Sequence, residues 1–182
     1  MSQPFPAALP LTIRPSTDAD LPAIQAIYAH AVENGTGTFE TETPSVDEMG
    51  RRRAEVLGRN LPWLVAERNG EPLGYAYANY FRPRLAYRFC VEDSIYLAPA
   101  AQGQGVGRLL LAELLARCEA AGARQMLAVI GDAANAGSVG VHTALGFEHT
   151  GVLKSAGWKF GRWLDVVLMQ RPLGLGDSVG AE

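Results

Sequence analysis

Three glycines stand within five residues, at Gly103, Gly105 and Gly107, directly before an amphipathic run. Glycines let a backbone approach a ligand closely, and the first N–H groups of a helix have no partner inside the helix. Together with the helix dipole, such a turn suits an anion such as a pyrophosphate. A glycine-rich turn can also do no more than start a helix, so both readings stay open from this segment alone.

Two common phosphate motifs are absent from this turn. A P-loop needs Gly-Lys-Ser or Gly-Lys-Thr after its glycines, and no Gly-Lys pair follows. A Rossmann fingerprint needs a third glycine at position 108, where Arg108 stands, and an acidic residue about twenty positions later after a second strand. A phosphate ligand of this turn would therefore belong to another class.

The elements that must position the turn alternate along the chain. Apolar alternation and short apolar runs predict strands over residues 11–14, 63–67, 73–80, 89–97, 125–130, 148–153 and 163–169. Helical spacing and capping residues predict helices over 21–34, 45–58, 104–121 and 138–145. This order indicates an α/β sandwich with a mixed sheet, in which one strand leads into the glycine turn.

Composition limits the function. The 182 residues are 48% hydrophobic and 19% charged with a net charge of -3, a mixture that excludes a mainly disordered chain. There is no basic excess, so we expect no nucleic-acid partner. We expect one domain over residues 10–172, between a Pro/Ala-rich flexible tail at 1–9 and a Gly-rich flexible tail at 173–182.

The sequence predicts neither a metal nor a membrane. Two cysteines, Cys90 and Cys118, cannot make a four-ligand zinc site, and the three histidines lack H-E-x-x-H spacing. Both cysteines fit apolar positions, as small buried residues in a reducing compartment. No signal-peptide pattern and no apolar stretch near the roughly 18 residues of a membrane span are found. We expect a cytoplasmic protein.

Several motifs together resemble a known family. Gln102-x-x-Gly105-x-Gly107 matches the Gln/Arg-x-x-Gly-x-Gly/Ala signature of the GCN5-related N-acetyltransferases (GNAT), whose loop holds the acetyl-CoA pyrophosphate. Four further segments, in order, resemble the phosphinothricin and methionine sulfoximine/sulfone acetyltransferases: 62–67, 87–96, 135–147 and 159–165. The resemblance runs over residues 11–171. It implies a mixed, mostly antiparallel sheet flanked by helices and split next to the acetyl-CoA site, and a homodimer.

The resemblance assigns residues to the cofactor. Backbone groups of Ile95, Tyr96 and Leu97 would pair with the pantetheine arm as an added strand would. The turn would wrap the pyrophosphate with Gln102, Gly103, Gln104, Gly105, Val106, Gly107 and Arg108. Asn135 and Ser138, at the start of the next helix, would touch the pantetheine arm.

The resemblance also implies two catalytic groups. Glu92, on the strand before the turn, would be the general base, and its alternative is a strand-edge carboxylate paired with Arg84 or Arg88. His142 stands where many relatives place the Tyr that protonates the departing thiolate. Its alternative is a helix histidine that donates to a nearby carbonyl. Tyr96 is a second, weaker candidate for the acid.

The substrate site is implied around the same strand. Related enzymes hold their amino acid with the segment that matches Arg82, Pro83 and Arg84, and guanidinium forks suit carboxylates and phosphinates. The alternative is a solvated basic loop. Ser94 and the neighbouring pair Glu92 and Asp93 complete the expected site. In a regular strand Asp93 points to the opposite sheet face from Glu92, and relatives carry another polar residue there.

The implied function is direct acetyl transfer from acetyl-CoA to the α-amine of phosphinothricin, methionine sulfoximine, methionine sulfone or a similar small amino acid. No nucleophilic cysteine stands in the motif region, although Cys90 points the same way as Glu92. Lys159 and Arg162 match the family and could serve dimer packing or substrate contact. Two rivals remain: a GNAT enzyme for a protein N-terminus, polyamine or aminoglycoside, and a CoA-binding module without turnover.

Overall fold

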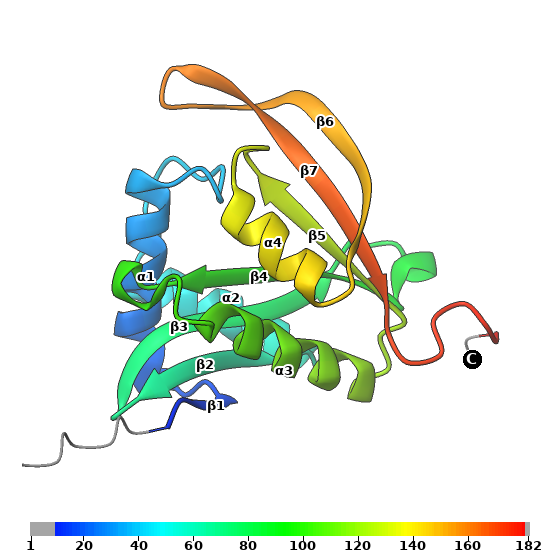
Figure 1. Ribbon diagram of the computed structural model, residues 1–182. Coiled ribbons are helices and arrows are strands. Elements are labelled where there is room, and N and C mark those ends of the chain that lie inside the picture. The colour runs from blue at the N-terminus through cyan, green and yellow to red at the C-terminus, as the bar shows by residue number, and fades with distance from the viewer. Residues whose placement is uncertain (1–9, 181–182) are drawn as a thin grey trace, which may run out of the picture.

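The computed structural model describes residues 10–180, with helices on both faces of one central sheet (Figure 1). The strands are β1 (Thr12–Pro15), β2 (Trp63–Arg68), β3 (Glu71–Tyr80), β4 (Cys90–Leu97), β5 (Gln125–Gly131), β6 (Glu148–Lys159) and β7 (Arg162–Pro172). The longer helices are α1 (Leu21–Asn34), α2 (Val46–Gly58), α3 (Val106–Ala120) and α4 (Ala136–Ala144). Short 3-10 turns lie at Asp18–Asp20, Leu85–Tyr87 and Pro99–Ala101.

The sheet has the order β1-β2-β3-β4-β5-β7-β6. All neighbouring strands are antiparallel except β4 and β5, which are parallel. These two pair only from Cys90 with Gln125 to Glu92 with Leu127, and beyond Glu92 they separate. The mixed, mostly antiparallel sheet with a split, expected from the sequence, is therefore confirmed.

Local sequence explains why the elements around the split form. Asn69 and Gly70 have φ of 58° and 78°, the two left-handed residues that a tight turn between β2 and β3 requires. Helix α3 places six apolar side chains under the sheet, all buried: Val106, Leu110, Leu111, Leu114, Leu115 and Cys118. Burial of this stripe fixes the helix, and with it the glycine turn at its start, against β2, β3 and β4.

The two faces of β4 contact different helices. Tyr96 meets Tyr28 of α1 edge to face, with ring centroids 4.9 Å apart. Ile95 and Leu97 lie against Gly107 of α3 on the other face. Because side chains alternate along a strand, even-numbered residues of β4 point toward α1 and α2, and odd-numbered ones toward α3 and α4. Figure 1 shows α3 and α4 together on the near face of the sheet.

Two parts of the chain extend further than the sequence indicates. The last two strands continue to Lys159 and Pro172 and form a long hairpin at one edge of the sheet, and its closed end extends beyond β5 (Figure 1). The segment after Pro172, which we expected to be a flexible tail, is anchored to the domain at Leu173 and through Arg124, although most of its other described residues are exposed. Leu173 is 1% exposed, and the Arg124 guanidinium donates to the carbonyls of Gly176 and Val179. The expected N-terminal tail, residues 1–9, lies outside the described residues.

Candidate active site

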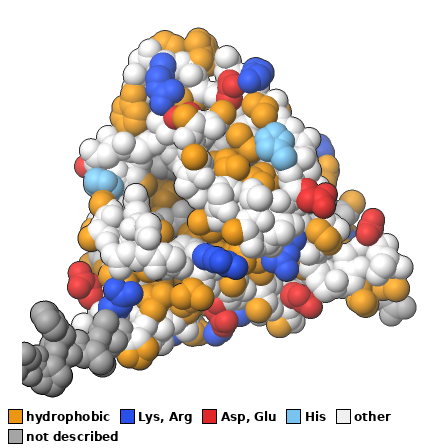
Figure 2. Space-filling model, in the orientation of Figure 1, with side chains coloured by type: hydrophobic (Ala, Val, Ile, Leu, Met, Phe, Trp, Pro, Cys, Tyr) orange, Lys and Arg blue, Asp and Glu red, His pale blue; other side chains and the backbone are white. Residues whose placement is uncertain are grey.

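A cleft of about 1060 Å³ lies where β4 and β5 separate. Its wall is built from the second half of β4, the glycine turn, the start of α4, the end of β5 and the segment after α1. Figure 2 shows the surface hollowed on this face. Because the sheet opens at Glu92, the cleft reaches from the surface to the backbone of a central strand.

The glycine turn has the backbone that its sequence demands. Gly103 and Gly105 have φ of 71° and 79°, a left-handed conformation that residues with a Cβ rarely adopt. Gly107 lies in the first turn of α3, where an added Cβ would come 3.3 Å from the Leu97 side chain. The first N–H groups of α3 are left at the cleft wall, as an anion site needs.

Nearly all the residues expected to hold the cofactor line this one cleft: Ile95, Tyr96, Leu97, Gln102, Gly103, Gly105, Val106, Gly107, Arg108, Asn135 and Ser138. Gln104 is the exception. Its side-chain amide donates to the carbonyl of Ala100 over 2.6 Å and its oxygen accepts from Arg68. Gln104 therefore stabilises the turn from outside the cleft.

The open edge of β4 is the feature that suits an extended ligand. From Ser94 to Leu97 the strand pairs with β3 on one side only. Its backbone groups on the other side face the cleft, where an extended chain could add as a further strand. The Asn135 side chain accepts from the Ser138 N–H over 3.2 Å and so fixes the start of α4 opposite this edge.

Glu92 lies between the cleft and a second, smaller cavity. The smaller cavity, about 200 Å³, is lined by Tyr77, Asn79, Tyr80, Glu92 and Ser94. Burial raises the pKa of Glu92 above its ordinary value, and the charge of Asp93 raises it further while Arg82 opposes both. Among the described residues Glu92 forms no ion pair with Arg84 or Arg88. A half-buried carboxylate of this kind is suited to accept a proton near neutral pH.

His142 and Asp93 form a buried pair on the opposite face of β4. Their side chains are each 2% exposed, with Nε2 of His142 3.1 Å from Oδ2 of Asp93. Nδ1 of His142 lies 2.7 Å from the carbonyl oxygen of Ser138 in the preceding turn of α4. The contact to a nearby carbonyl, one alternative for His142, is therefore present, and a carboxylate contact accompanies it. Both residues line the cleft.

The basic segment before β4 is exposed and outside the cleft lining. Arg82, Pro83 and Arg84 are all exposed, and the Arg82 guanidinium stacks on the ring of Phe81 at 4.9 Å. Arg82 acts on the site through its charge, since it lowers the pKa of Glu92 against the stronger effect of burial.

The segment 34–39 after α1 is a part of the cleft wall that the sequence did not indicate. Lys159, 4% exposed, donates to the carbonyls of Gly35 and Thr38 at 2.8 and 2.9 Å. Phe39 fills the space over Gly157, where no side chain would fit. The run Asn-Gly-Thr-Gly-Thr reads only as a helix end, because its partners come from a hairpin more than a hundred residues later.

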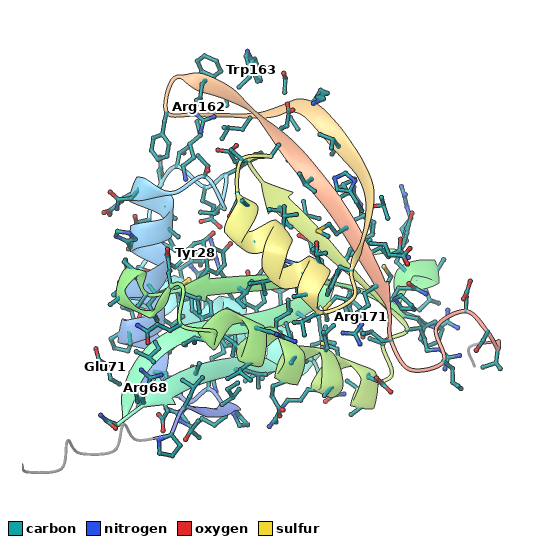
Figure 3. The ribbon with its side chains drawn as sticks, viewed as in Figure 1. Tyr28, Arg68, Glu71, Arg162, Trp163 and Arg171 are labelled. Atoms are coloured by element: carbon teal, nitrogen blue, oxygen red, sulfur yellow. The ribbon has the colours of Figure 1, made fainter. Side chains whose placement is uncertain are left out.

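Asp132, at the end of β5, ties the same segment to the hairpin. It accepts from the Thr36 hydroxyl over 2.9 Å and from Arg162 over 2.7 Å. In Figure 3 Arg162 points inward from the hairpin, whereas Trp163 points away from the body. These bonds join the segment after α1 and the hairpin to the end of β5, which borders the cleft.

Neither a metal-binding group of side chains nor a membrane-spanning helix is found in residues 10–180. Within this range no three side chains of His, Cys, Asp or Glu gather in a way that could hold a metal ion. In the same range no helix has the length and apolar character needed to cross a membrane.

Comparisons with known proteins agree with this geometry. The family model of the Acetyltransferase (GNAT) family matches residues 24–147. A phosphinothricin N-acetyltransferase from Alcaligenes faecalis is 59% identical over 167 residues, which are 92% of this chain and 85% of that protein. An L-methionine sulfoximine/L-methionine sulfone acetyltransferase from Pseudomonas paraeruginosa is 42% identical over 163 residues, 87% of this chain and 92% of that protein.

A solved structure is similar over the same range. It is a GNAT superfamily phosphinothricin acetyltransferase from Sinorhizobium meliloti in complex with AcCoA. The two structures superpose with a TM-score of 0.91 at 49% sequence identity, and the match covers 94% of this chain and 93% of the other. The split sheet and the cleft beside it therefore occur in a fold known to hold acetyl-CoA.

Proposed function

The chain belongs to the acetyltransferase (GNAT) family and is an acetyl-CoA-dependent N-acetyltransferase, and we propose that its acceptor is the α-amine of a small amino acid or analogue. Phosphinothricin, methionine sulfoximine and methionine sulfone are the first candidates, since the relatives named for them align with nearly the whole chain. The observation that carries the proposal is the position of Glu92, a half-buried carboxylate between the cofactor-sized cleft and a small second cavity.

The cofactor-binding residues fit acetyl-CoA by their chemistry. The N–H groups of the glycine turn would receive the pyrophosphate, and the open edge of β4 would pair with the pantetheine amides. Asn135 and Ser138 border the same path. When bound there, acetyl-CoA supplies an activated acyl group as a thioester. This chain's part is to orient that group, remove a proton from the amine and provide a proton for the sulfur.

Glu92 is the proposed general base. An ammonium group does not attack a carbonyl, so the acceptor amine must lose a proton at the site. Burial raises the pKa of Glu92, which strengthens it as a base. Its side chain lies on the face of β4 that carries Ser94 and borders the small cavity. His142 is the proposed acid, which approaches the cleft from the opposite face.

The small cavity and the basic segment are the proposed acceptor side. About 200 Å³ matches the side chain of a small amino acid rather than an aminoglycoside. Arg82 is the proposed partner of the acceptor carboxylate, since its charge already reaches Glu92. Asp93 points away from this cavity, and Arg84 stays a candidate for the rim.

The transfer is proposed to be direct. Cys90 is the thiol nearest to Glu92 along the strand, and burial raises its pKa, with the charge of Glu92 adding to the effect. A protonated thiol is a poor nucleophile. The amine itself therefore attacks the acyl group, with no acyl-enzyme between.

We also propose a homodimer in the cytoplasm. Trp158, Phe160 and Trp163 are each more than half exposed at the β6–β7 hairpin, and exposed apolar patches of this kind are typical of association surfaces. Light scattering of the wild type and of Trp163→Glu tests this. A dimer that Trp163→Glu dissociates supports the hairpin as the interface, and a monomeric wild type contradicts the proposal.

The acceptor is tested by thiol release from acetyl-CoA with a panel of amines. The panel contains phosphinothricin, methionine sulfoximine, methionine sulfone, plain amino acids, spermidine, an aminoglycoside and an N-terminal peptide. Turnover confined to the amino acids and their analogues supports the proposal. Turnover only on the other amines would overturn the acceptor class, and acetyl-CoA binding without turnover would favour a binding module.

A further inference from the structure

Asp93 stands at the point where the sheet opens. It is the first residue of β4 beyond the last pair with β5, Glu92 with Leu127. Its side chain is 2% exposed, on the face covered by α3 and α4, and it borders the cleft. A buried carboxylate lowers stability unless it is well paired. Holding the cofactor and the acceptor as proposed above does not require it, so its partner indicates what it does.

That partner is His142, whose two ring nitrogens are both engaged. Nδ1 lies 2.7 Å from the carbonyl oxygen of Ser138. A carbonyl oxygen only accepts hydrogen bonds, so Nδ1 must carry a hydrogen. Nε2 lies 3.1 Å from Oδ2 of Asp93. Phe147 packs edge to face against the ring at 4.9 Å and holds it in this orientation.

The geometry of the pair requires a second proton. With Nδ1 already protonated, the contact between Nε2 and Oδ2 is a hydrogen bond only if one more proton lies between these two atoms. The pair then holds this proton either as imidazolium and carboxylate or as imidazole and carboxylic acid. Either way the pair is neutral overall, which suits a buried site. A lone buried imidazole would not hold that second proton at neutral pH.

We propose that Asp93 is a positioning residue that keeps a second proton on His142, so that the pair serves as the proton donor beside the cleft. This inference rests on the acetyltransferase activity proposed above. In the reaction the ammonium group first loses one proton through Glu92 to solvent. The neutral amine then forms a bond to the acyl carbon and gives a second proton to Glu92. The carbon–sulfur bond breaks, and the sulfur takes one proton from the pair. Net return of a proton from Glu92 through solvent restores both groups.

The groups around the pair support this assignment. The charge of Asp93 opposes the lowering effect of burial on His142, and the net pKa of His142 is raised above its ordinary value. From α3, Cys118 comes near Asp93, and burial with that charge raises its pKa to about 12, so it stays a neutral thiol. From β4, Glu92 is the other titratable neighbour of Asp93. The ring neighbour Phe147 carries no charge.

The first test is the titration of His142 by NMR in the protein without any substrate. Only three histidines are present, and His142→Gln identifies the signal of interest. We expect His142 to titrate above the ordinary histidine range in the wild type and below it in Asp93→Asn. Asparagine keeps a donor for a neutral Nε2 but holds no exchangeable carboxyl proton. A His142 that stays neutral in the wild type, or titrates alike in both, overturns the proposal.

The second test links the proton to turnover. An acid must be protonated, so kcat falls as pH rises through its pKa. In Asp93→Asn this fall should move to lower pH, with kcat at pH 8 reduced at least about tenfold and the acetyl-CoA Kd changed less than about threefold. Asp20→Asn, which alters a buried, paired carboxylate near β1, is the matched control and should leave the profile in place.

A merely structural tie between α4 and β4 gives a different pattern. Asp93→Asn would then lower the free energy of unfolding, or shift the NMR titration, and the pH profile of kcat would stay in place; this result overturns the proposal. Failure of the acetyltransferase function itself is recognised separately, as loss of turnover on every amine. In that case the NMR titration still decides whether Asp93 keeps the second proton on His142.

Discussion

Glu92 and Asp93 are neighbours in the chain whose side chains lie on opposite faces of one strand, at the point where that strand leaves its parallel partner. Glu92 borders the small cavity on the side of α1 and α2, and Asp93 contacts His142 on the side of α4. Both nevertheless border the same cleft, because the sheet is open just there. The proposed base and the proposed acid thus reach one space from two sides without neutralising each other.

Glu92→Gln removes the proposed base and keeps the size of the side chain. We expect kcat to fall by about 10²- to 10⁴-fold, the range in which general base catalysis contributes. The glycine turn and the open edge of β4 are untouched, so isothermal titration should give an unchanged acetyl-CoA Kd. Turnover at the wild-type rate would remove Glu92 from this role.

Arg82 should control the acid side of the pH profile. The base must be ionised, so kcat/KM falls as pH drops through the pKa of Glu92. Arg82 lowers this pKa while burial raises it. In Arg82→Gln the fall should therefore begin at higher pH, as measured by initial rates between pH 5 and 8. Arg88→Gln, in the same exposed segment, is the control and should leave the fall where it is.

Lys159→Met tests how the segment 34–39 is held. The change leaves the carbonyls of Gly35 and Thr38 without their donor, so we expect a loss of about 1–3 kcal/mol in the free energy of unfolding. Lys154→Met is matched, since Lys154 is exposed and pairs with Asp165. Equal effects of the two variants would contradict a specific role for Lys159.

The pairing of Asp20 with Arg14 predicts that part of the free energy of unfolding is lost at acid pH. The hydrogen bond from Arg14 lowers its pKa from an ordinary 3.8 to about 2. A lowered carboxyl pKa stabilises the folded state above the unfolded pKa, and this stabilisation disappears as pH falls toward 2. Asp20→Asn should therefore lower the free energy of unfolding by about 1–3 kcal/mol at pH 7.

Urea unfolding at several pH values measures the difference in the free energy of unfolding between the wild type and Asp20→Asn. It should stay constant down to about pH 4 and shrink below it, in line with the two pKa values of Asp20. Asp18→Asn removes an exposed partner of Arg53 and should change little at any pH. A difference that grows toward low pH would contradict the assignment.

The variant Cys90→Ser distinguishes direct acetyl transfer from transfer through an acyl-enzyme. Because the pKa of Cys90 is raised by burial, we expect the variant to keep its turnover within about twofold, as for a residue that is no nucleophile. Mass spectrometry of the wild type mixed with acetyl-CoA should find no acetyl group on Cys90. A stable acetyl adduct together with an inactive variant would contradict direct transfer.

The sequence predicts most of the fold because its local signals agree with the tertiary contacts. The Asn69-Gly70 turn, the apolar stripe of α3 and the glycine turn before it are short-range patterns, and each is present in the structure. The opposite facing of Glu92 and Asp93 follows from strand alternation alone. These features need no knowledge of distant partners.

What the sequence could not predict depends on contacts between distant segments. The pairing of Asp93 with His142 joins residues 49 positions apart, and Lys159 reaches carbonyls more than 120 positions earlier. Leu173 looks like part of a tail until its N–H is seen to donate to the Arg124 carbonyl. Polar groups carry no periodic signal, so only the folded arrangement shows which of them meet.

The brief parallel pairing of β4 with β5 also bears on how the chain folds during synthesis. Strands β1 to β4 are sequential antiparallel neighbours, so this half can form its pairs while the rest is still on the ribosome. Strand β5 pairs along its second edge only with β7, which begins some thirty residues later in the chain. The cleft needs both halves and is therefore finished last. Binding of acetyl-CoA to the completed cleft would draw that final step toward the native state by mass action.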